Sequence, residues 1–292
     1  MNDAPQLPAG AGAQWLLTGF ALLRRSPLGL GALGALFGVI TVALLLASEV
    51  APALAGPLQL VNALLTPLLM AGLVWAVREV DQARPAQPGH LLRGLQEAGA
   101  ARLLATLLPQ LAGAVLLLAL LLALVGLQDL QTLLKLVEDA QQQVEPDPAL
   151  VESLPFGRMA LWLLLGVVIG LAVLFFTFTA LPQIVFEKRP AFDAMRRSFR
   201  ACVRNLGAML VFVPLLLITF IGISVLVQLV SFPINMLAGM RAMVMVAQVL
   251  MMAVLMPVVA GAIYAAWRQM HAPADAGVDA AAPLARNGEI EA

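Results

Sequence analysis

Charged side chains are scarce in this sequence of 292 residues. Asp, Glu, Lys and Arg make up 12% of it, whereas a soluble globular protein has about 25%. Hydrophobic residues make up 61%, against about 45–50% in soluble proteins. The surface of a water-soluble fold cannot accommodate this excess. The composition therefore excludes a water-soluble enzyme, a disordered chain and, with a single cysteine, a disulfide scaffold.

Residues that hold metals or bind nucleic acids are also few. A zinc site needs about four clustered ligands, and the only two histidines, His90 and His271, are far apart in the sequence. Motifs that bind phosphate or zinc are missing, so we expect neither a metal nor a cofactor. The 17 basic and 17 acidic residues give a net charge of zero, which leaves no overall electrostatic basis for nucleic-acid binding.

The sequence contains instead six long stretches without charged residues. A helix needs about 20 apolar residues to cross the bilayer core, and each stretch is long enough. Lipid cannot satisfy exposed backbone groups and no alternating strand pattern is present, so these segments must be helical. We therefore predict an all-α, polytopic membrane helical bundle with six transmembrane helices. The predicted spans are at about 28–48, 57–77, 104–126, 160–181, 208–230 and 243–266.

The spans define a predicted transmembrane domain at 11–271. Residues 1–10 and 272–292 are rich in Ala, Pro, Gly and Asp, and we expect them to be disordered tails. Residues 231–235, which include a proline, and Arg241 are all that separates the fifth and sixth spans. This predicts a tight hairpin between them.

The distribution of basic residues predicts the orientation in the membrane. Six spans place both termini on one side, together with fourteen of the seventeen Lys and Arg residues. The opposite side has only Lys135, Arg158 and Arg241. Because cytoplasmic loops carry the excess of Lys and Arg, we expect both termini in the cytoplasm.

Three amphipathic segments lie at the predicted cytoplasmic surface, at 13–25, 89–102 and 190–204. In the third, four arginines fall within one 100° sector of a helix: Arg196, Arg197, Arg200 and Arg204. Bulky apolar residues fill the opposite-leaning sector: Phe192, Met195, Phe199, Cys202 and Val203. This pattern is typical of an interfacial helix, and we expect the arginines to contact anionic lipid headgroups at about 1 kcal/mol each. Alternatively they only keep the loop inside, because the positive-inside rule alone predicts a basic loop.

The same spacing suggests an internal repeat of one amphipathic helix and two spans. The three units would cover roughly 11–78, 89–189 and 191–268. In the first and third units a proline precedes a closing arginine by eleven residues, in PLLMAGLVWAVRE and PVVAGAIYAAWRQ. A threefold helical-hairpin repeat is therefore possible.

The predicted spans contain no Asp, Glu, Lys, Arg or His. Ion-coupled carriers normally need such a group in the membrane, and no candidate nucleophile has a histidine base nearby. We therefore expect no catalytic residue and no enzymatic activity. Four polar residues in the spans are candidates for lining a cavity between proline-kinked helices: Asn62, Thr66, Gln110 and Gln183. Hydrogen bonding between helices is an equally open interpretation.

Small residues in the spans indicate where helices can approach each other closely. The pairs Gly34/Gly38 and Gly166/Gly170 have the GxxxG spacing. Prolines in or at the ends of five spans can kink the helices. Fixed kinks that shape the bundle are the preferred interpretation, and hinges around a cavity are the alternative.

Three longer motifs carry a family resemblance: QWLLTGFALLRRSPLGL, PLLMAGLVWAVRE and TALPQIVFEKRPAFDAMRRSFRACVRNLGAML. Over about residues 11–270 the sequence resembles a family of six-span inner-membrane proteins of proteobacteria. This family is related to YciC-like proteins and to the membrane domain attached to some glycerophosphodiester phosphodiesterases. The resemblance implies a bacterial inner-membrane location and supplies no activity and no catalytic residues. No phosphodiesterase domain accompanies the spans, so the resemblance does not imply that activity.

Two functions fit the sequence. The first is a non-enzymatic scaffold or accessory membrane protein whose basic cytoplasmic helices contact anionic lipid; a second membrane protein or a second copy could be its partner. The alternative is a transporter or lipid-handling protein with a polar cavity. A continuous polar cavity in mid-membrane would favour transport, and a closed, tightly packed bundle would favour a scaffold.

Overall fold

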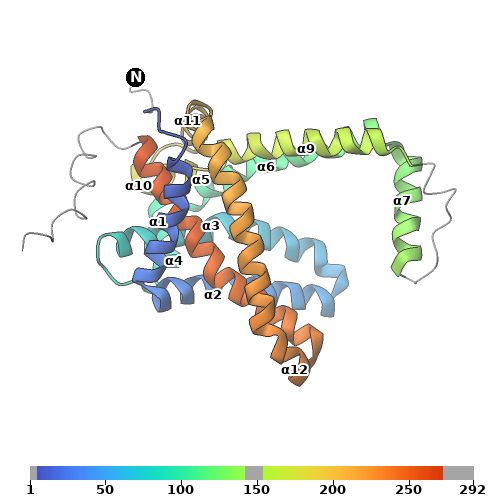
Figure 1. Cartoon of the computed structure of the whole chain (residues 1–292), viewed down its shortest axis with the longest axis horizontal. Helices are drawn as coiled ribbons and strands as arrows, with labels where there is room; N and C mark the ends of the chain where they lie inside the picture. Colours follow the sequence, from blue (N-terminus) through green and yellow to red (C-terminus); the bar gives the residue numbers. More distant parts are fainter. Residues whose placement is uncertain (1–4, 142–153, 272–292) are drawn as a thin grey trace, which may run out of the picture. The chain divides into compact units, whose positions relative to one another are not determined.

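The computed structural model describes residues 5–141 and 154–271, and in this part of the chain every regular element is a helix (Figure 1). The elements are α1 (Ala11–Arg25), α2 (Pro27–Val50), the 3₁₀ turn η1 (Pro52–Leu54), α3 (Ala55–Asp81), α4 (His90–Ala98), α5 (Ala100–Leu104), the 3₁₀ turn η2 (Ala105–Leu107), α6 (Leu108–Leu124), α7 (Gly126–Gln141), α9 (Phe156–Thr177), α10 (Ala180–Glu187), α11 (Ala191–Arg204) and α12 (Leu206–His271). The predicted all-α class is confirmed.

The chain forms two compact units. Unit 1 consists of Met1–Thr106 and Thr177–Ala292, and unit 2 of Leu107–Phe176. Unit 1 therefore contains α1 to α5 and α10 to α12, whereas α6, α7 and most of α9 form unit 2. The domain predicted at 11–271 is thus built from two units. The tail predicted at 272–292 lies outside the described residues.

Five helical segments are long and apolar enough to cross a membrane: Pro27–Val50, Pro52–Asp81, Ala100–Leu124, Phe156–Glu187 and Leu206–His271. They coincide with the predicted spans, except that the last segment covers both the fifth and the sixth. The chain is therefore a multi-pass membrane protein by the length and composition of its helices.

The last segment is divided by a single residue. Gly239 has φ 84° and ψ 169°, which is outside the helical region, so α12 consists of a first arm (206–238) and a second arm (240–271). The turn lies within the interval 231–242 that the sequence leaves between the fifth and sixth predicted spans, but it is at Gly239 rather than at Pro233, through which the helix continues. Only glycine adopts a positive φ without steric cost, which explains why the chain turns at Gly239.

The two arms run antiparallel, because α1 contacts the start of one arm and the end of the other. A side chain added at Gly12 would meet the backbone of Ala208 and Phe212. One added at Gly19 would meet the backbone of Val258 and Ala262. At a rise of 1.5 Å per residue, each arm measures about 48 Å.

Close glycine contacts also join α2 to the second arm. The missing Cβ of Gly34 would lie 2.5 Å from the Met252 carbonyl oxygen, and that of Gly38 would lie 2.9 Å from the Val249 Cα. The first GxxxG pair is therefore a helix-packing site. Within unit 2 the second pair is different: a Cβ at Gly166 meets only a leucine methyl at 3.6 Å, and one at Gly170 meets nothing within 4 Å.

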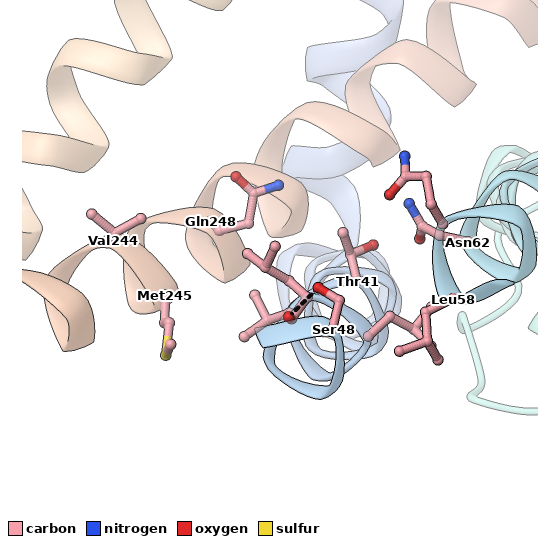
Figure 2. A pocket seen from close by; sticks show the side chains of 11 residues that line it. Thr41, Ser48, Leu58, Asn62, Val244, Met245 and Gln248 are labelled. Carbon is pink, nitrogen blue, oxygen red and sulfur yellow. Dashed lines mark hydrogen bonds between the residues drawn. The ribbon is translucent and has the colours of Figure 1, made fainter. Parts of the chain in front are cut away.

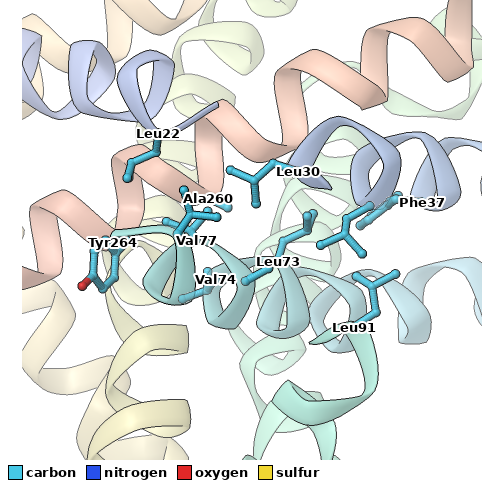
Figure 3. Close-up of a cluster of buried hydrophobic side chains, with 12 residues drawn as sticks. Leu22, Leu30, Phe37, Leu73, Val74, Val77, Leu91, Ala260 and Tyr264 are labelled. Atoms are coloured by element: carbon cyan, nitrogen blue, oxygen red, sulfur yellow. The ribbon is translucent and has the colours of Figure 1, made fainter. Parts of the chain in front are cut away.

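The core of unit 1 is apolar and draws on five helices (Figure 3). Leu30 and Leu33 of α2 and Leu73 and Val77 of α3 pack with Ala260 of α12, and α1 and α4 add further leucines. This core lies at the Arg78 and Arg268 ends of α3 and α12, so it fixes the helix ends on which the short amphipathic helices rest.

Unit 2 is held by polar contacts as well as apolar packing. The indole Nε1 of Trp162 donates a hydrogen bond to the Leu117 carbonyl (2.9 Å), which joins α9 to α6. Arg158 forms an ion pair with Asp129 of α7 (3.2 Å). The ion pair thus joins the first turn of α7 to the start of α9, and the hydrogen bond joins α9 to α6.

The start of the described chain is attached to the bundle. The side-chain oxygen of Asn205 accepts a hydrogen bond from the Leu7 amide (2.7 Å), and its amide nitrogen donates to the Pro5 carbonyl (3.1 Å). Asn205 is itself buried. Within the tail that the sequence predicts to be disordered at 1–10, Pro5 and Leu7 are thus hydrogen-bonded to a buried carboxamide.

Candidate functional site

The basic helix α11 packs on the bundle with a face of small residues. Its buried side chains recur at helical spacing: Ala191, Ala194, Met195, Ser198, Ala201 and Cys202. The Thr179 backbone amide donates a hydrogen bond to the Ser198 hydroxyl (3.0 Å), which fixes this face against the start of α10. The amphipathic helix predicted at 190–204 is present.

The exposed side of α11 has two adjoining sectors. Arg196, Arg200 and Arg204 are exposed, and Arg197 is partly buried. Beside them lie Phe192, which is 68% exposed, and Val203, which is 49% exposed. The apolar face predicted for this helix needs correction at Met195 and Cys202, which point into the protein. The remaining apolar residues adjoin the arginines, as a helix between headgroups and acyl chains requires.

The first two amphipathic segments form helices α1 and α4, but their apolar faces also turn toward the protein. Trp15, Leu16 and Leu22 of α1 are buried, and so is Leu91 of α4. The sequence places these segments at the membrane surface but does not reveal what their apolar faces contact, because amphipathic periodicity does not distinguish a lipid neighbour from a protein neighbour. Phe20 of α1, at 37% exposed, is one of the apolar side chains that remain outside.

A carboxylate at the end of α10 connects α11 to the last helix. One oxygen of Glu187 accepts a hydrogen bond from the Trp267 indole (2.8 Å). The other forms ion pairs with Arg189 and, at 3.6 Å, with Arg197. Arg197 is therefore engaged within the protein, which separates it from the other arginines of the predicted set.

A second carboxylate joins three helix ends. Asp81, at the end of α3, accepts hydrogen bonds from the Tyr264 hydroxyl (3.0 Å) and from Arg268, and it lies 3.7 Å from Arg25 of α1. The Arg78 guanidinium stacks 4.7 Å from the centre of the Phe186 ring. The matching arginines of the two repeat-like strings, Arg78 and Arg268, thus meet the same cluster of charged and aromatic side chains.

The opposite end of unit 1 has a different charge pattern. Glu49, next to the last residue of α2, forms an ion pair with Arg241, which lies just after the turn at Gly239. Arg268 belongs to the other end of the second arm of α12, and Arg25 is the last residue of α1, two residues before the start of α2. Unit 1 therefore has a strongly basic end and an opposite end at which Arg241 is neutralised by Glu49.

The four predicted cavity residues do not come together. Gln110 is exposed and belongs to unit 2. Gln183 is completely buried beside Thr179, and its amide nitrogen lies 3.4 Å from the Ala194 carbonyl and 3.3 Å from His271 Nε2. This position joins α10, α11 and the end of α12. Gln183 therefore serves the docking of α11.

The other two predicted cavity residues lie on α3. Thr66 is exposed and donates a hydrogen bond to the Asn62 carbonyl (2.9 Å). The Asn62 side chain lines a pocket of about 160 Å³ between α2, α3 and the second arm of α12 (Figure 2). Two further carboxamides line this pocket, Gln59 and Gln248, which are not among the four predicted cavity residues. The i, i+3 spacing of Gln59 and Asn62 is the signal that could have found one of them.

The only cysteine of the sequence is unreactive because of where it lies in the fold. Cys202 is buried in the docked face of α11, and burial raises the pKa of its thiol to about 12. Because the thiolate is the nucleophile, at pH 8 only ~10⁻⁴ of the thiol is reactive, against about a quarter for a free cysteine with a pKa near 8.5. We expect N-ethylmaleimide to label Cys202 at least about 100-fold more slowly in the folded protein than in SDS. Equal rates in a labelling time course would show that α11 is not docked.

Among the described residues of unit 1, the basic face of α11 and the carboxamide pocket both present polar groups to a ligand. No family model, curated protein or solved structure matches the chain.

Proposed function

We propose that this chain is a non-enzymatic protein of the bacterial inner membrane that acts by binding, as a scaffold or accessory subunit. Its basic end contacts anionic lipid headgroups through α11. The family resemblance and the scarcity of catalytic residue types in the sequence support this proposal.

The proposal includes six spans with both termini in the cytoplasm. The turn at Gly239 supports the sixth span, because it divides α12 into two arms that each exceed the 30 Å bilayer core. The asymmetry of Lys and Arg supports the orientation. Arg25, Arg268 and α11 then all face the cytoplasmic leaflet, where anionic lipids attract basic residues.

The observation that carries the proposal is that two arginines of α11 have no ion-pair partner among the described residues. The side chains of Arg196 and Arg200 are exposed, and neither side chain forms an ion pair or a hydrogen bond with any residue in 5–141 or 154–271. They adjoin the exposed Phe192 and Val203 on a helix whose other face is already packed. A lipid phosphate above this helix would pair with the arginines, and acyl chains beside it would cover the exposed apolar side chains.

The test compares Arg196→Ala/Arg200→Ala with the unaltered chain by native mass spectrometry from nanodiscs that contain phosphatidylglycerol. At about 1 kcal/mol per arginine, we expect the affinity for bound phosphatidylglycerol to fall about 30-fold. Lys135→Ala is the matched control, because Lys135 is an exposed basic residue on α7. It should leave the affinity unchanged.

Two results would contradict the proposal. If the double variant retains the same lipid as the unaltered chain, the arginines serve only topology. If Lys135→Ala has an equal effect, the binding depends on overall charge rather than on α11. Slow labelling of Cys202 in each variant would show that α11 remains docked, so a loss of lipid could be assigned to the missing charges.

A further inference from the structure

Some polar side chains of the pocket between α2, α3 and α12 form hydrogen bonds within the protein, and others do not. The Thr41 hydroxyl donates a hydrogen bond to the Phe37 carbonyl (3.2 Å), and the Ser48 hydroxyl donates to the Leu45 carbonyl (2.6 Å). The carboxamides of Gln59, Asn62 and Gln248 make no hydrogen bond to any other residue that the structure describes. Figure 2 shows Asn62 and Gln248 on either side of Thr41, from different helices.

Unpaired carboxamides are costly in this setting. Each carries two N–H donors and a carbonyl acceptor, and a polar group without a partner in the bilayer costs several kcal/mol. Leucine at these three positions would avoid that cost. A ligand with its own donors and acceptors would also avoid it, and three converging carboxamides provide a site for such a ligand.

The lining of the pocket defines the chemical class of the ligand. None of the eleven residues around it is charged, so a phosphate or an ammonium group would have no counter-charge. Val42, Leu44 and Met245 supply apolar walls. The volume of about 160 Å³ corresponds to about five water molecules at ~30 Å³ each. This is room for a small polar head, and the acyl chains would remain in the bilayer.

The depth of the pocket fits the same ligand. Ser48 lies two residues from the end of α2, Asn62 seven residues after the start of α3, and Gln248 nine residues after Gly239. At 1.5 Å per residue these positions are about 3–14 Å from the Glu49–Arg241 end of unit 1. In the proposed orientation this is the level of the glycerol and upper acyl region of the outer leaflet.

We propose that this pocket binds the hydroxyl-bearing head of an uncharged lipid of the diacylglycerol class. A free hydroxyl both donates and accepts, so it can pair with a carboxamide oxygen on one helix and a carboxamide N–H on another. The ester carbonyls accept from the remaining N–H groups. The site is separate from α11, and only its assignment to the outer leaflet depends on the proposed topology.

The experiment uses the full chain in nanodiscs of phosphatidylcholine with a small fraction of dioleoylglycerol, and native mass spectrometry measures the retained dioleoylglycerol. One molecule should remain bound to the unaltered chain. Asn62→Leu/Gln248→Leu should weaken binding at least about tenfold, because the paired groups are lost. Gln110→Leu is the matched control, since it removes an exposed carboxamide from unit 2, and it should bind as the unaltered chain does.

A second variant keeps all three carboxamides and fills the space. Leu45→Trp, on the pocket wall, should abolish retention of dioleoylglycerol while Cys202 stays protected. If Asn62→Leu/Gln248→Leu or Leu45→Trp retains as much dioleoylglycerol as the unaltered chain does, the proposal is overturned. Arg196→Ala/Arg200→Ala should leave dioleoylglycerol binding intact, so failure of the lipid-headgroup proposal and failure of this one give different results.

Discussion

Replacing Trp15 by alanine is expected to lower the free energy of unfolding by about 3–5 kcal/mol, the usual cost of removing a buried aromatic side chain. Trp15 is completely buried, and its ring centre lies 5.9 Å from that of Phe178 and 5.8 Å from that of Phe212. Its Nε1 donates a hydrogen bond to Gln269 Oε1 (2.8 Å), so the substitution also leaves this acceptor unpaired. SDS titration of the protein in mixed micelles measures the change.

The control for Trp15 lies on the same helix. Phe20 is 37% exposed, and Phe20→Ala should change the free energy of unfolding by about 0.5 kcal/mol or less, as surface substitutions do. Equal, small effects of Trp15→Ala and Phe20→Ala would mean that α1 lies on lipid as the sequence pattern suggests, rather than against α12. The comparison therefore decides between a docked and an interfacial α1.

The second large effect concerns the close contact between α2 and the second arm of α12. A Cβ at Gly34 would lie 2.9 Å from the Ala253 Cα as well as 2.5 Å from the Met252 oxygen, so the two backbones must move apart. We expect Gly34→Ala to lower the free energy of unfolding by about 1–3 kcal/mol, the cost of overpacking. A shift of the SDS midpoint to lower detergent is the readout.

Gly31, three residues earlier, provides a control, because alanine there should leave the free energy of unfolding unchanged or raise it. A Cβ at Gly31 would meet its nearest atom, the Ala253 oxygen, at 3.8 Å, which is an ordinary contact. Because alanine is favoured over glycine in a helix by about 0.8–1 kcal/mol, Gly31→Ala should be neutral or stabilising. If Gly34→Ala is as well tolerated as Gly31→Ala, α2 and α12 do not pack as closely as the structure places them.

The sequence predicts the membrane helices well for a physical reason. A span must be apolar over the whole thickness of the bilayer, and this requirement leaves a long run without charges that can be read directly. The turn in α12 is harder to place, because Pro233 and Gly239 are both plausible breakers. Proline removes one hydrogen bond and can stay within a helix, whereas the positive φ at Gly239 ends it.

The candidate sites depend on information that periodicity does not contain. Periodicity predicts the exposed arginines of α11, because their sector is far from the apolar one. It does not reveal that Glu187 engages Arg197, since the two residues meet through the packing of three helices. Asn62 and Gln248 are 186 positions apart, so their convergence on one pocket is a property of the tertiary fold.

The docking of α1 has a consequence for the order in which the protein can be completed. Trp15 and Gln269 are separated by 254 residues, so the ribosome synthesises α1 long before the second arm of α12, against which α1 packs. At about 5–20 residues per second, the buried face of α1 waits roughly 13–50 s for its partner. During that interval only lipid or a helper protein can shield it, and closure of the bundle becomes the last step of its biogenesis.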